Sequence, residues 1–365
     1  MKNEQIGNIK ICLVISDLNK GGMQRVMSEL ANYFGGKTDA KVELILLTSE
    51  HSIFYKVLPS VKIHKPTFKF DRRWRFISTL KTLYYLRMKI RNVKPNVVLS
   101  FGEMYNSFVL LSTLLLNVRV FISDRSKPDK NWGFIHNNLR KLLYPYATGI
   151  IAQTNFAKEF LTNELKHENI EVIPNPIKLI SATTQERDNI ILNVGRIIKS
   201  KRLDLLLEIF SKVNNTGWQL WIIGDDEGNE KENLETLARK FGIENKVKIL
   251  GKQENIIKFY KRAKIFAFTS ESEGFPNVLL EAMAADMASI SFDCIAGPNE
   301  IISDNKNGYL IEMYDIESYV KKLNILIADH DKLKEISFNA RSSVEKYAIE
   351  TIGQQFYNFL SRKNE

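Results

Sequence analysis

The feature that most constrains the fold of this chain is an alternation of short apolar segments with amphipathic ones along its whole length. The first half contains apolar segments at residues 10–16, 42–48, 96–100, 119–123, 149–153 and 170–176, and the second half contains 189–195, 218–224, 247–251, 265–270 and 288–293. Helical patterns lie between them, such as MQRVMSELANYF (23–34) and KRLDLLLEIFSKV (201–213). Short buried strands that alternate with helices form parallel sheets covered on both faces. The pattern therefore predicts an α/β fold.

The length predicts two domains. A chain of 365 residues exceeds what one hydrophobic core usually organises. The stretch Pro174-Asn175-Pro176 interrupts the alternation, and the polar segment SATTQERD (181–188) follows it. We place the domains at residues 1–178 and 179–347 and expect two Rossmann-like domains facing a cleft.

Several features predict a cytoplasmic protein. The two cysteines, Cys12 and Cys294, show no spacing typical of a disulfide framework or a zinc site, which favours a reducing compartment. The first residues, MKNEQIGNIK, lack the apolar core of a signal peptide. The longest apolar stretch, residues 108–118, falls short of the roughly 20 residues that span a bilayer.

Charge is unevenly distributed. Residues 1–180 carry 27 Lys and Arg against 14 Asp and Glu, whereas residues 181–365 carry 25 against 28. Within the first half, residues 68–95 hold nine basic residues and one acid, Asp71, with aromatic residues between them. This segment fits a solvated basic helix, a helix that docks on an anionic membrane surface, or a nucleic-acid contact, although no nucleic-acid motif accompanies the charge.

The segment ESEGFPNVLLEAM (271–283) follows an apolar strand pattern and holds two carboxylates eight residues apart. Pro276 has no N–H group and biases the preceding residue towards extended backbone, so a helix is expected to begin near Asn277. Glu273 then lies in the loop and Glu281 in the second turn of the helix. The N–H groups of a helix start attract anions, which suits a phosphorylated ligand with hydroxyl groups on either side.

Loops after three other strands carry further polar or glycine-rich stretches. Gly21 and Gly22 precede a helix and allow backbone to approach an anion, although such a pair is often only a turn. Arg196 and Lys201 follow the first strand of the second half and fit a diphosphate, with a solvated basic loop as the alternative. AGPNEII (296–302) shapes a turn before a helix. GxGxxG and GxxxxGK[ST] are absent, which argues against a dinucleotide dehydrogenase and a P-loop enzyme.

Taken in order, GGMQR (21–25), NVGRIIKSKRLDLLLEIF (193–210), ESEGFPNVLLEAMA (271–284) and AGPNEII (296–302) resemble the retaining glycosyltransferases of family 4, which have the GT-B fold. The resemblance covers nearly the whole chain and is closest to members that build bacterial polysaccharides on lipid carriers. It implies an acceptor-binding first domain and a second domain that binds a nucleotide sugar. The C-terminal segment, residues 348–365, would return as a helix to the first domain.

The resemblance also implies roles for individual residues. Arg196 and Lys201 would bind the donor diphosphate, Glu281 the ribose, and Glu273 the hydroxyl groups of the donor sugar rather than act as a nucleophile. The remaining residues expected at the donor are Gly21, Gly22, Gly274, Phe275, Pro276, Asn277 and Val278. No metal or other cofactor is expected, and residues 225–227 are assigned to the ribose side rather than to a metal.

One departure concerns the first domain. Many relatives place a histidine after the strand that corresponds to residues 119–123, whereas this chain reads SDRSKPD (123–129) there. Asp124 and Arg125 are therefore candidate substrate-binding residues, with a surface salt bridge as the alternative. Glu103 is a candidate for orienting the acceptor, with a simple helix-opening role as the alternative.

The resulting prediction is a metal-independent, retaining hexosyltransferase. It would use a nucleotide-sugar donor, with uridine diphosphate (UDP) expected, and a glycan or polyprenyl-diphosphate-linked acceptor. The setting would be cell-surface polysaccharide, lipopolysaccharide or capsule synthesis, with the basic first domain peripheral on the inner face of the cell membrane and no nucleic acid bound. The alternatives are a non-hydrolysing sugar-nucleotide epimerase and a non-enzymatic basic module that binds nucleic acid or membrane.

Overall fold

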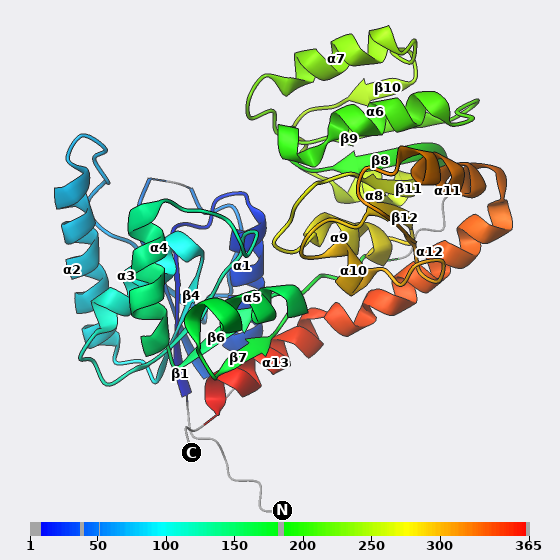
Figure 1. Cartoon of the computed structure of the whole chain (residues 1–365). Helices are drawn as coiled ribbons and strands as arrows, with labels where there is room; N and C mark the ends of the chain where they lie inside the picture. The colour runs from blue at the N-terminus through cyan, green and yellow to red at the C-terminus, as the bar shows by residue number, and fades with distance from the viewer. Residues whose placement is uncertain (1–8, 37–39, 51, 182–185, 363–365) are drawn as a thin grey trace, which may run out of the picture. The chain divides into compact units, whose positions relative to one another are not determined.

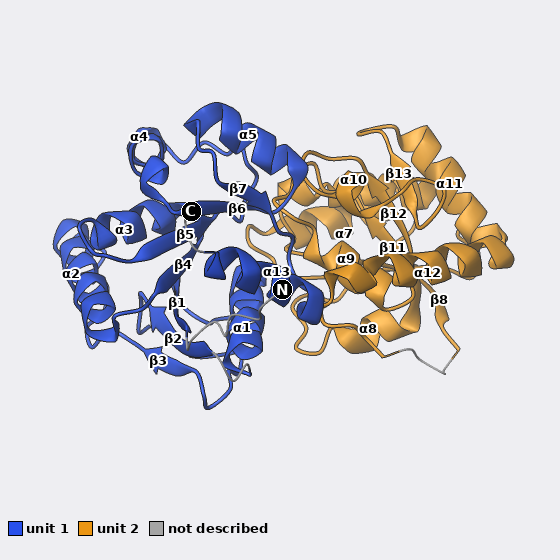
Figure 2. Ribbon diagram, turned by 90° about the horizontal axis from the view of Figure 1, so that it is seen from below, with its two compact units in different colours: residues 1–176, 349–365 blue, residues 177–348 orange. Residues whose placement is uncertain are grey.

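The chain divides into two compact units, which are coloured separately in Figure 2. A computed structural model describes residues 9–36, 40–50, 52–181 and 186–362. Unit 1 consists of residues 1–176 and 349–365, and unit 2 of residues 177–348. Residues 182–185 of the predicted polar segment and the first eight residues, used for the signal-peptide prediction, lie outside the described ranges.

Unit 1 is built on a seven-stranded parallel sheet in the order β3-β2-β1-β4-β5-β6-β7. Its strands are β1 (Ile9–Ile15), β2 (Ala40–Leu46), β3 (Lys62–His64), β4 (Val97–Phe101), β5 (Arg119–Ser123), β6 (Gly149–Ala152) and β7 (Ile170–Val172). Its α-helices, labelled in Figure 1, are α1 (Gly22–Gly35), α2 (Arg75–Val93), α3 (Glu103–Thr113), α4 (Phe134–Leu143), α5 (Asn155–Leu165) and α13 (Ile349–Ser361). This order is that of a doubly wound Rossmann-like sheet.

Unit 2 repeats this architecture with six parallel strands in the order β10-β9-β8-β11-β12-β13. Its strands are β8 (Asp188–Val194), β9 (Gln219–Ile223), β10 (Val247–Ile249), β11 (Ala263–Phe268), β12 (Ala288–Phe292) and β13 (Tyr309–Ile311). Its α-helices are α6 (Leu203–Lys212), α7 (Glu230–Lys240), α8 (Ile257–Arg262), α9 (Asn277–Ala284), α10 (Pro298–Ile301), α11 (Ile316–Ala328) and α12 (His330–Val344). The predicted α/β class with two Rossmann-like units is confirmed.

The local sequence explains how these elements form. In α1, Val26, Leu30 and Phe34 recur every four residues and are fully buried against the sheet, as an amphipathic helix requires. Central strands such as β4 are buried along their whole length, which fits a sheet covered on both faces. Gly102 takes a φ of +99° and so lets the chain turn from β4 straight into α3.

The C-terminal helix α13 packs on unit 1, as predicted. The Phe359 ring meets Phe121 of β5 edge-on with 5.1 Å between centroids, and Gly353 lies against the Tyr33 ring of α1. A Cβ atom on Gly353 would come within 2.5 Å of that ring. The helix therefore completes the core of a unit whose other residues end 173 positions before it in the chain, at Pro176.

Helix α2 exposes apolar and aromatic side chains. Trp74, Phe76, Ile77, Leu80 and Tyr84 lie in its first half and just before it, and all five are largely exposed. Among the described residues, no helix combines the length and the apolar composition that crossing a bilayer requires.

Candidate functional site

The polar loops predicted in the second half of the chain all follow strands of one parallel sheet. Arg196 and Lys201 follow β8, residues 225–227 follow β9, residues 271–276 follow β11, and residues 293–297 follow β12. Because β9, β8, β11 and β12 are consecutive neighbours in the sheet, these loops lie at its carboxyl edge, where open α/β sheets bind ligands.

Lys201 and Glu273 form an ion pair at this edge. Lys201 Nζ lies 2.5 Å from Glu273 Oε1, and the two side chains are only 17% and 14% exposed. The Thr269 hydroxyl donates to the Lys201 carbonyl oxygen at 3.0 Å, which fixes the turn on the β11 loop. Lys201 and Glu273, which lie 72 residues apart in the sequence, are thus in direct contact. The alternative of a solvated basic loop is wrong for Lys201.

Arg196 also has a carboxylate partner, but in a more open setting. Its Nη1 lies 3.0 Å from Glu227 Oε2, with both side chains about half exposed. Such pairs contribute little to stability, so Arg196 can exchange this partner for a ligand at low cost. Gly224 makes the underlying turn possible, because a Cβ atom there would lie 1.6 Å from the Gly195 carbonyl oxygen.

Glu281 lies on α9, and its carboxylate is oriented by a neighbouring helix. The hydroxyl of Tyr260, a buried residue of α8, donates to Glu281 Oε2 at 3.0 Å. Helix α9 begins at Asn277, as predicted. In its first turn, Leu279 N–H donates to the Pro276 carbonyl oxygen at 3.0 Å. Phe275 and Pro276 are buried, whereas Gly274 and Asn277 on either side are partly exposed.

The loop after β12 contacts the loop that carries Glu273. Glu273 N–H donates to the Ile295 carbonyl oxygen at 3.3 Å, and Gly297 lies against Pro276. A Cβ atom on Gly297 would come within 2.4 Å of Pro276 Cδ, so the close approach of the two loops requires glycine there. Burial, reinforced by the charge of Glu273, raises the pKa of the adjacent Cys294 thiol to about 12, so that thiol is neutral.

In unit 1, Gly21 and Gly22 lie in the loop after β1, and Gly22 begins α1. Gly21 has a φ of 178°, an extended value that any residue adopts, and a Cβ atom there would meet only the flexible end of the Gln24 side chain. Glycine is therefore not required at position 21 by backbone strain. The predicted anion contact at this loop stays a prediction.

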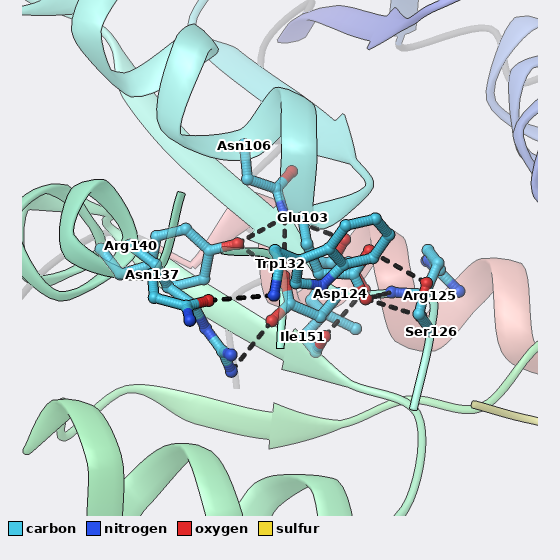
Figure 3. Close-up of polar contacts among 11 residues, drawn as sticks. Glu103, Asn106, Asp124, Arg125, Ser126, Trp132, Asn137, Arg140 and Ile151 are labelled. Atoms are coloured by element: carbon cyan, nitrogen blue, oxygen red, sulfur yellow. Dashed lines mark hydrogen bonds and ion pairs between the residues drawn. The ribbon is translucent and has the colours of Figure 1, made fainter. Parts of the chain in front are cut away.

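Asp124 lies at the centre of a buried polar network at the end of β5 (Figure 3). Its Oδ1 accepts hydrogen bonds from the Tyr144 hydroxyl at 2.6 Å and from Asn106 Nδ2 at 3.0 Å. Arg140 of α4 lies 3.3 Å from its other oxygen. Burial and the charge of Asp124 raise the pKa of Tyr144 well above its ordinary value. Asp124 is 8% exposed, so the alternative of a surface salt bridge is wrong.

Arg125 is held by both its backbone and its side chain. The Glu103 carboxylate accepts hydrogen bonds from the backbone N–H groups of Arg125 and Ser126 at 2.8 and 2.6 Å. The Arg125 guanidinium lies over the Phe101 ring, 3.5 Å from its centroid, and donates to Asn175 Oδ1. Burial lowers the pKa of Arg125 to about 9, against the charges of Glu103 and Asp124, so it remains protonated at neutral pH.

Glu103 is the first residue of α3. Burial raises the pKa of its carboxyl, and the charge of Asp124 raises it further. The opposing effect comes from the N–H groups that donate to it. Its carboxylate is directed at the loop after β5 rather than left at an exposed helix start.

Sequence reasoning did not find several partners in both sites. They are Tyr260, Arg140, Tyr144, Asn106 and Asn175, each joined to a predicted residue by a contact described above. Glu227 belongs to the residues assigned to the ribose side, but its pairing with Arg196 was not predicted. No local motif marks them, since each lies between 16 and 50 residues from its partner. Only a fold that specifies which helices are neighbours could have identified them.

Comparison with known proteins gives two family matches in sequence order. Residues 20–179 match the family described as Glycosyltransferase Family 4, and residues 178–343 match Glycosyl transferases group 1. Together the two matches extend over residues 20–343.

The chain is similar over nearly its full length to two curated bacterial proteins. It is 27% identical over 367 residues to a Campylobacter jejuni α-1,4-N-acetyl-D-galactosaminyltransferase whose name specifies an undecaprenol-diphosphate-linked glycan, covering 97% of this chain and 98% of that protein. It is 27% identical over 364 residues to the amylovoran biosynthesis glycosyltransferase AmsD of Erwinia amylovora, covering 96% and 99%. The solved structure of HepE from Anabaena in complex with UDP aligns with a TM-score of 0.82 at 16% identity, covering 97% of this chain and all of that one.

Proposed function

Since the chain belongs to the glycosyltransferases that join a family 4 domain to a group 1 domain in the GT-B fold, we propose that it is a retaining hexosyltransferase that uses a UDP-sugar. The acceptor is a glycan or a polyprenyl-diphosphate-linked glycan of bacterial surface polysaccharide, lipopolysaccharide or capsule synthesis. The curated relatives named above support this acceptor class, and the UDP complex of HepE supports the donor class. Family membership favours this activity over an epimerase and over a binding module.

The observation that carries the proposal is the set of four charged residues at the carboxyl edge of the unit 2 sheet. Arg196 and Lys201 supply positive charge for the diphosphate, Glu273 accepts from hydroxyl groups of the donor sugar, and Glu281, oriented by Tyr260, accepts from the ribose. Backbone of residues 274–278 lines the phosphate and sugar. In unit 1, Gly21 and Gly22 let an anionic group of a substrate approach the backbone at the start of α1.

The pairing of Lys201 with Glu273 suits this chemistry. When the donor binds, the diphosphate replaces the carboxylate as partner of Lys201, and Glu273 turns to the hydroxyl groups of the sugar. The bond from the anomeric carbon to the β-phosphate oxygen breaks, and a bond from that carbon to the acceptor oxygen forms on the same face. The acceptor proton passes to the leaving phosphate. Fixed cations stabilise the charge that develops there, which is the function a metal would otherwise perform.

Two neighbouring lysines provide a matched test of the diphosphate contact. Lys201→Met removes the paired cation, whereas Lys199→Met removes one from the same turn whose side chain is 89% exposed. A hydrogen bond to a charged group is worth about 1.5–3 kcal/mol, so Lys201→Met should raise the Kd for UDP by roughly 10- to 150-fold. Lys199→Met should leave the Kd within about twofold, because exposed pairs contribute little.

Calorimetric titration with UDP and with UDP-sugars, with and without EDTA, measures this. Binding that survives EDTA and is lost only in Lys201→Met supports a metal-independent diphosphate site. Failure of the wild type to bind any of these nucleotides, or equal affinity in both variants, would refute the proposed donor site.

We further propose that unit 1 docks on an anionic membrane surface through α2. The exposed apolar residues of its first half stand among Arg72, Arg73, Arg75 and Lys81. Further along the helix, Tyr84, Tyr85 and Met88 line a groove of about 340 Å³ together with Phe68 from the segment before α2, and Lys81 and Lys89 flank it. Lys and Arg beside aromatic and apolar groups are typical of surfaces that bind the membrane interface.

Cosedimentation with vesicles tests this surface. Phe76→Ser should reduce binding to vesicles that contain anionic phosphatidylglycerol, because it removes a side chain that is 77% exposed on α2. Phe338→Ser changes a phenylalanine of α12 that is 72% exposed in unit 2, and should have no effect. Equal binding of wild type to neutral and anionic vesicles, or equal losses in both variants, would contradict the proposed surface.

A further inference from the structure

The chain passes between its two units twice, after Pro176 and before Ile349, and the two passages are held together. Ile177 N–H donates to the Tyr347 carbonyl oxygen at 2.9 Å, and Ile177 pairs with Ala348 as a parallel bridge. Pro174 and Pro176 also restrict the backbone just before the first passage. The connection is therefore a paired segment with restricted backbone rather than two independent linkers.

On the unit 1 side, the Arg125 guanidinium contacts the chain just before the first passage and the helix that follows the second. It donates to Asn175, two residues before Ile177, and lies 5.8 Å from the ring centroid of Phe356 in α13, the helix that follows the second passage. The Phe101 ring supports its flat face. Its Nε and Nη2 atoms are buried, and no described residue accepts a hydrogen bond from them. Arg125 is thus placed to position the passages rather than to reach solvent.

The same residue is fixed to the loop after β5. Glu103, the first residue of α3, accepts hydrogen bonds from the backbone N–H groups of Arg125 and Ser126 (Figure 3). These bonds join the loop that carries Arg125 to the start of α3. Asn175 is therefore connected to residues 123–131 through hydrogen bonds of Arg125 and Glu103.

On the unit 2 side, Tyr347 occupies the equivalent place. Its ring centroid lies 6.2 Å from that of Phe275, in the segment proposed to line the donor. Its hydroxyl donates to the Glu300 carbonyl oxygen at 3.0 Å, in the short helix that follows Gly297. Tyr347 thus contacts the loop after β11 and helix α10, while its carbonyl oxygen accepts from Ile177 N–H.

We propose that Arg125 and Tyr347 are positioning residues that couple the donor loop of unit 2 to the loop 123–131 of unit 1 through the paired passages. Occupancy of the donor site restrains Phe275, and through Tyr347, Ile177 and Asn175 it reduces the motion of the unit 1 loop. This coupling rests on the proposed function, because it takes UDP as the ligand of the unit 2 loops. It is a coupling between sites in the thermodynamic sense, with a defined set of contacts to perturb.

Hydrogen–deuterium exchange of the full-length protein, with and without UDP, tests the coupling. Each protein is studied at ten times its own Kd for UDP, determined by calorimetry, so that differences in affinity do not enter. In the wild type, UDP should slow exchange in residues 123–131 at least threefold. Arg125→Lys should abolish that slowing while still binding UDP, because Lys retains the charge but has neither the planar face nor the paired N–H donors of Arg. Tyr347→Leu should do the same, because it removes the ring beside Phe275 and the hydroxyl that donates to Glu300.

Asn175 supplies variants that do not alter either positioning residue. Asn175→Asp keeps an oxygen acceptor for Arg125 and should retain the UDP response, whereas Asn175→Leu should lose it. Arg239→Lys, on the exposed face of α7, is the control for the Arg-to-Lys change and should respond like the wild type. Thermal unfolding establishes that each variant is folded.

The outcomes separate this inference from the proposed function. Loss of the response in Arg125→Lys, Tyr347→Leu and Asn175→Leu, with retention in Asn175→Asp and Arg239→Lys, supports the coupling. UDP binding without any response of residues 123–131, or the same response in all variants, overturns the coupling alone. A wild type that binds no UDP overturns both the coupling and the proposed donor site.

Discussion

Gly224→Ala gives a quantitative test of how tightly the loops after β8 and β9 pack in unit 2. A Cβ atom at position 224 would lie 1.6 Å from the Gly195 carbonyl oxygen and 2.6 Å from its carbonyl carbon. Ordinary contact begins near 3.4 Å, so the two loops would have to separate by about 1.8 Å. Both atoms belong to backbone, so no side-chain rotation relieves the clash.

That separation breaks the hydrogen bonds that join the loops. Gly195 N–H donates to the Ile223 carbonyl oxygen at 2.9 Å, and Ile197 N–H to that of Asp225 at 2.8 Å. Each backbone bond is worth about 1 kcal/mol, and the overpacking itself costs about 1–3 kcal/mol. The reduced freedom of alanine in the unfolded chain offsets about 0.4–1 kcal/mol. We expect a net loss of about 3 kcal/mol, which for a unit of this size lowers Tm by about 6–12 °C.

Gly195→Ala is the matched control, because its Cβ atom would meet nothing nearer than Lys201 Cε at 3.7 Å, an ordinary contact. Urea unfolding followed by fluorescence of Trp218 and Trp221, both buried in or beside β9, reports on the affected part of unit 2. Gly195→Ala should stay within about 1 kcal/mol of the wild type, as substitutions at sites without a clash usually do. If Gly224→Ala were as stable as Gly195→Ala, the close approach of these two loops would be wrong.

Two further predictions follow from the buried groups. The raised pKa of Glu103 means that its contribution to the free energy of unfolding is present below the ordinary pKa of 4.5 and is lost as pH rises through the folded-state pKa. Between pH 4.5 and 8, Glu103→Gln should therefore lose less thermal stability than the wild type, whereas the variant of an exposed residue, Glu159→Gln, should follow the wild type. Parallel profiles of Tm against pH for all three proteins would contradict the shift. Because the pKa of Cys294 is raised to about 12, iodoacetamide should leave this cysteine unmodified at pH 8 until urea unfolds the protein, and mass spectrometry that finds it alkylated in the folded protein at the rate of a free thiol would contradict its burial.

The βα alternation in the sequence was sufficient for the fold class and for most strands. Residues 119–123 form β5 as predicted, and the helix expected near Asn277 begins there. The three-residue strands β7 and β10 were predicted within longer apolar segments, whereas β3 (Lys62–His64) and β13 (Tyr309–Ile311), of the same length, were not predicted. Each extends an edge of its sheet, so their identity depends on a neighbouring strand rather than on their own sequence.

The candidate site could be predicted as a set of loops but not as a set of contacts. Parallel topology brings the ends of neighbouring strands together, which is why Lys201 and Glu273 could be grouped before their contact was known. Nothing in the sequence indicates that they pair with each other, since 72 residues separate them. Asp124 illustrates the opposite case, because its flanking residues are polar and yet the fold buries it beneath α3 and α4.

The ion pair of Lys201 with Glu273 also determines how variants of this site have to be interpreted. Removing one member of a largely buried pair leaves the other charge without a partner, which costs about 3–5 kcal/mol when burial is complete and less at this partly exposed edge. Lys201→Met is expected to weaken UDP binding and also leaves the Glu273 carboxylate without its partner, so lost activity alone would not identify a diphosphate ligand. The double variant Lys201→Met with Glu273→Gln removes both charges and should recover most of the stability while UDP binding stays weak. Recovery of stability without recovery of affinity would assign Lys201 to the donor, whereas recovery of both would mean that its charge serves only to neutralise Glu273.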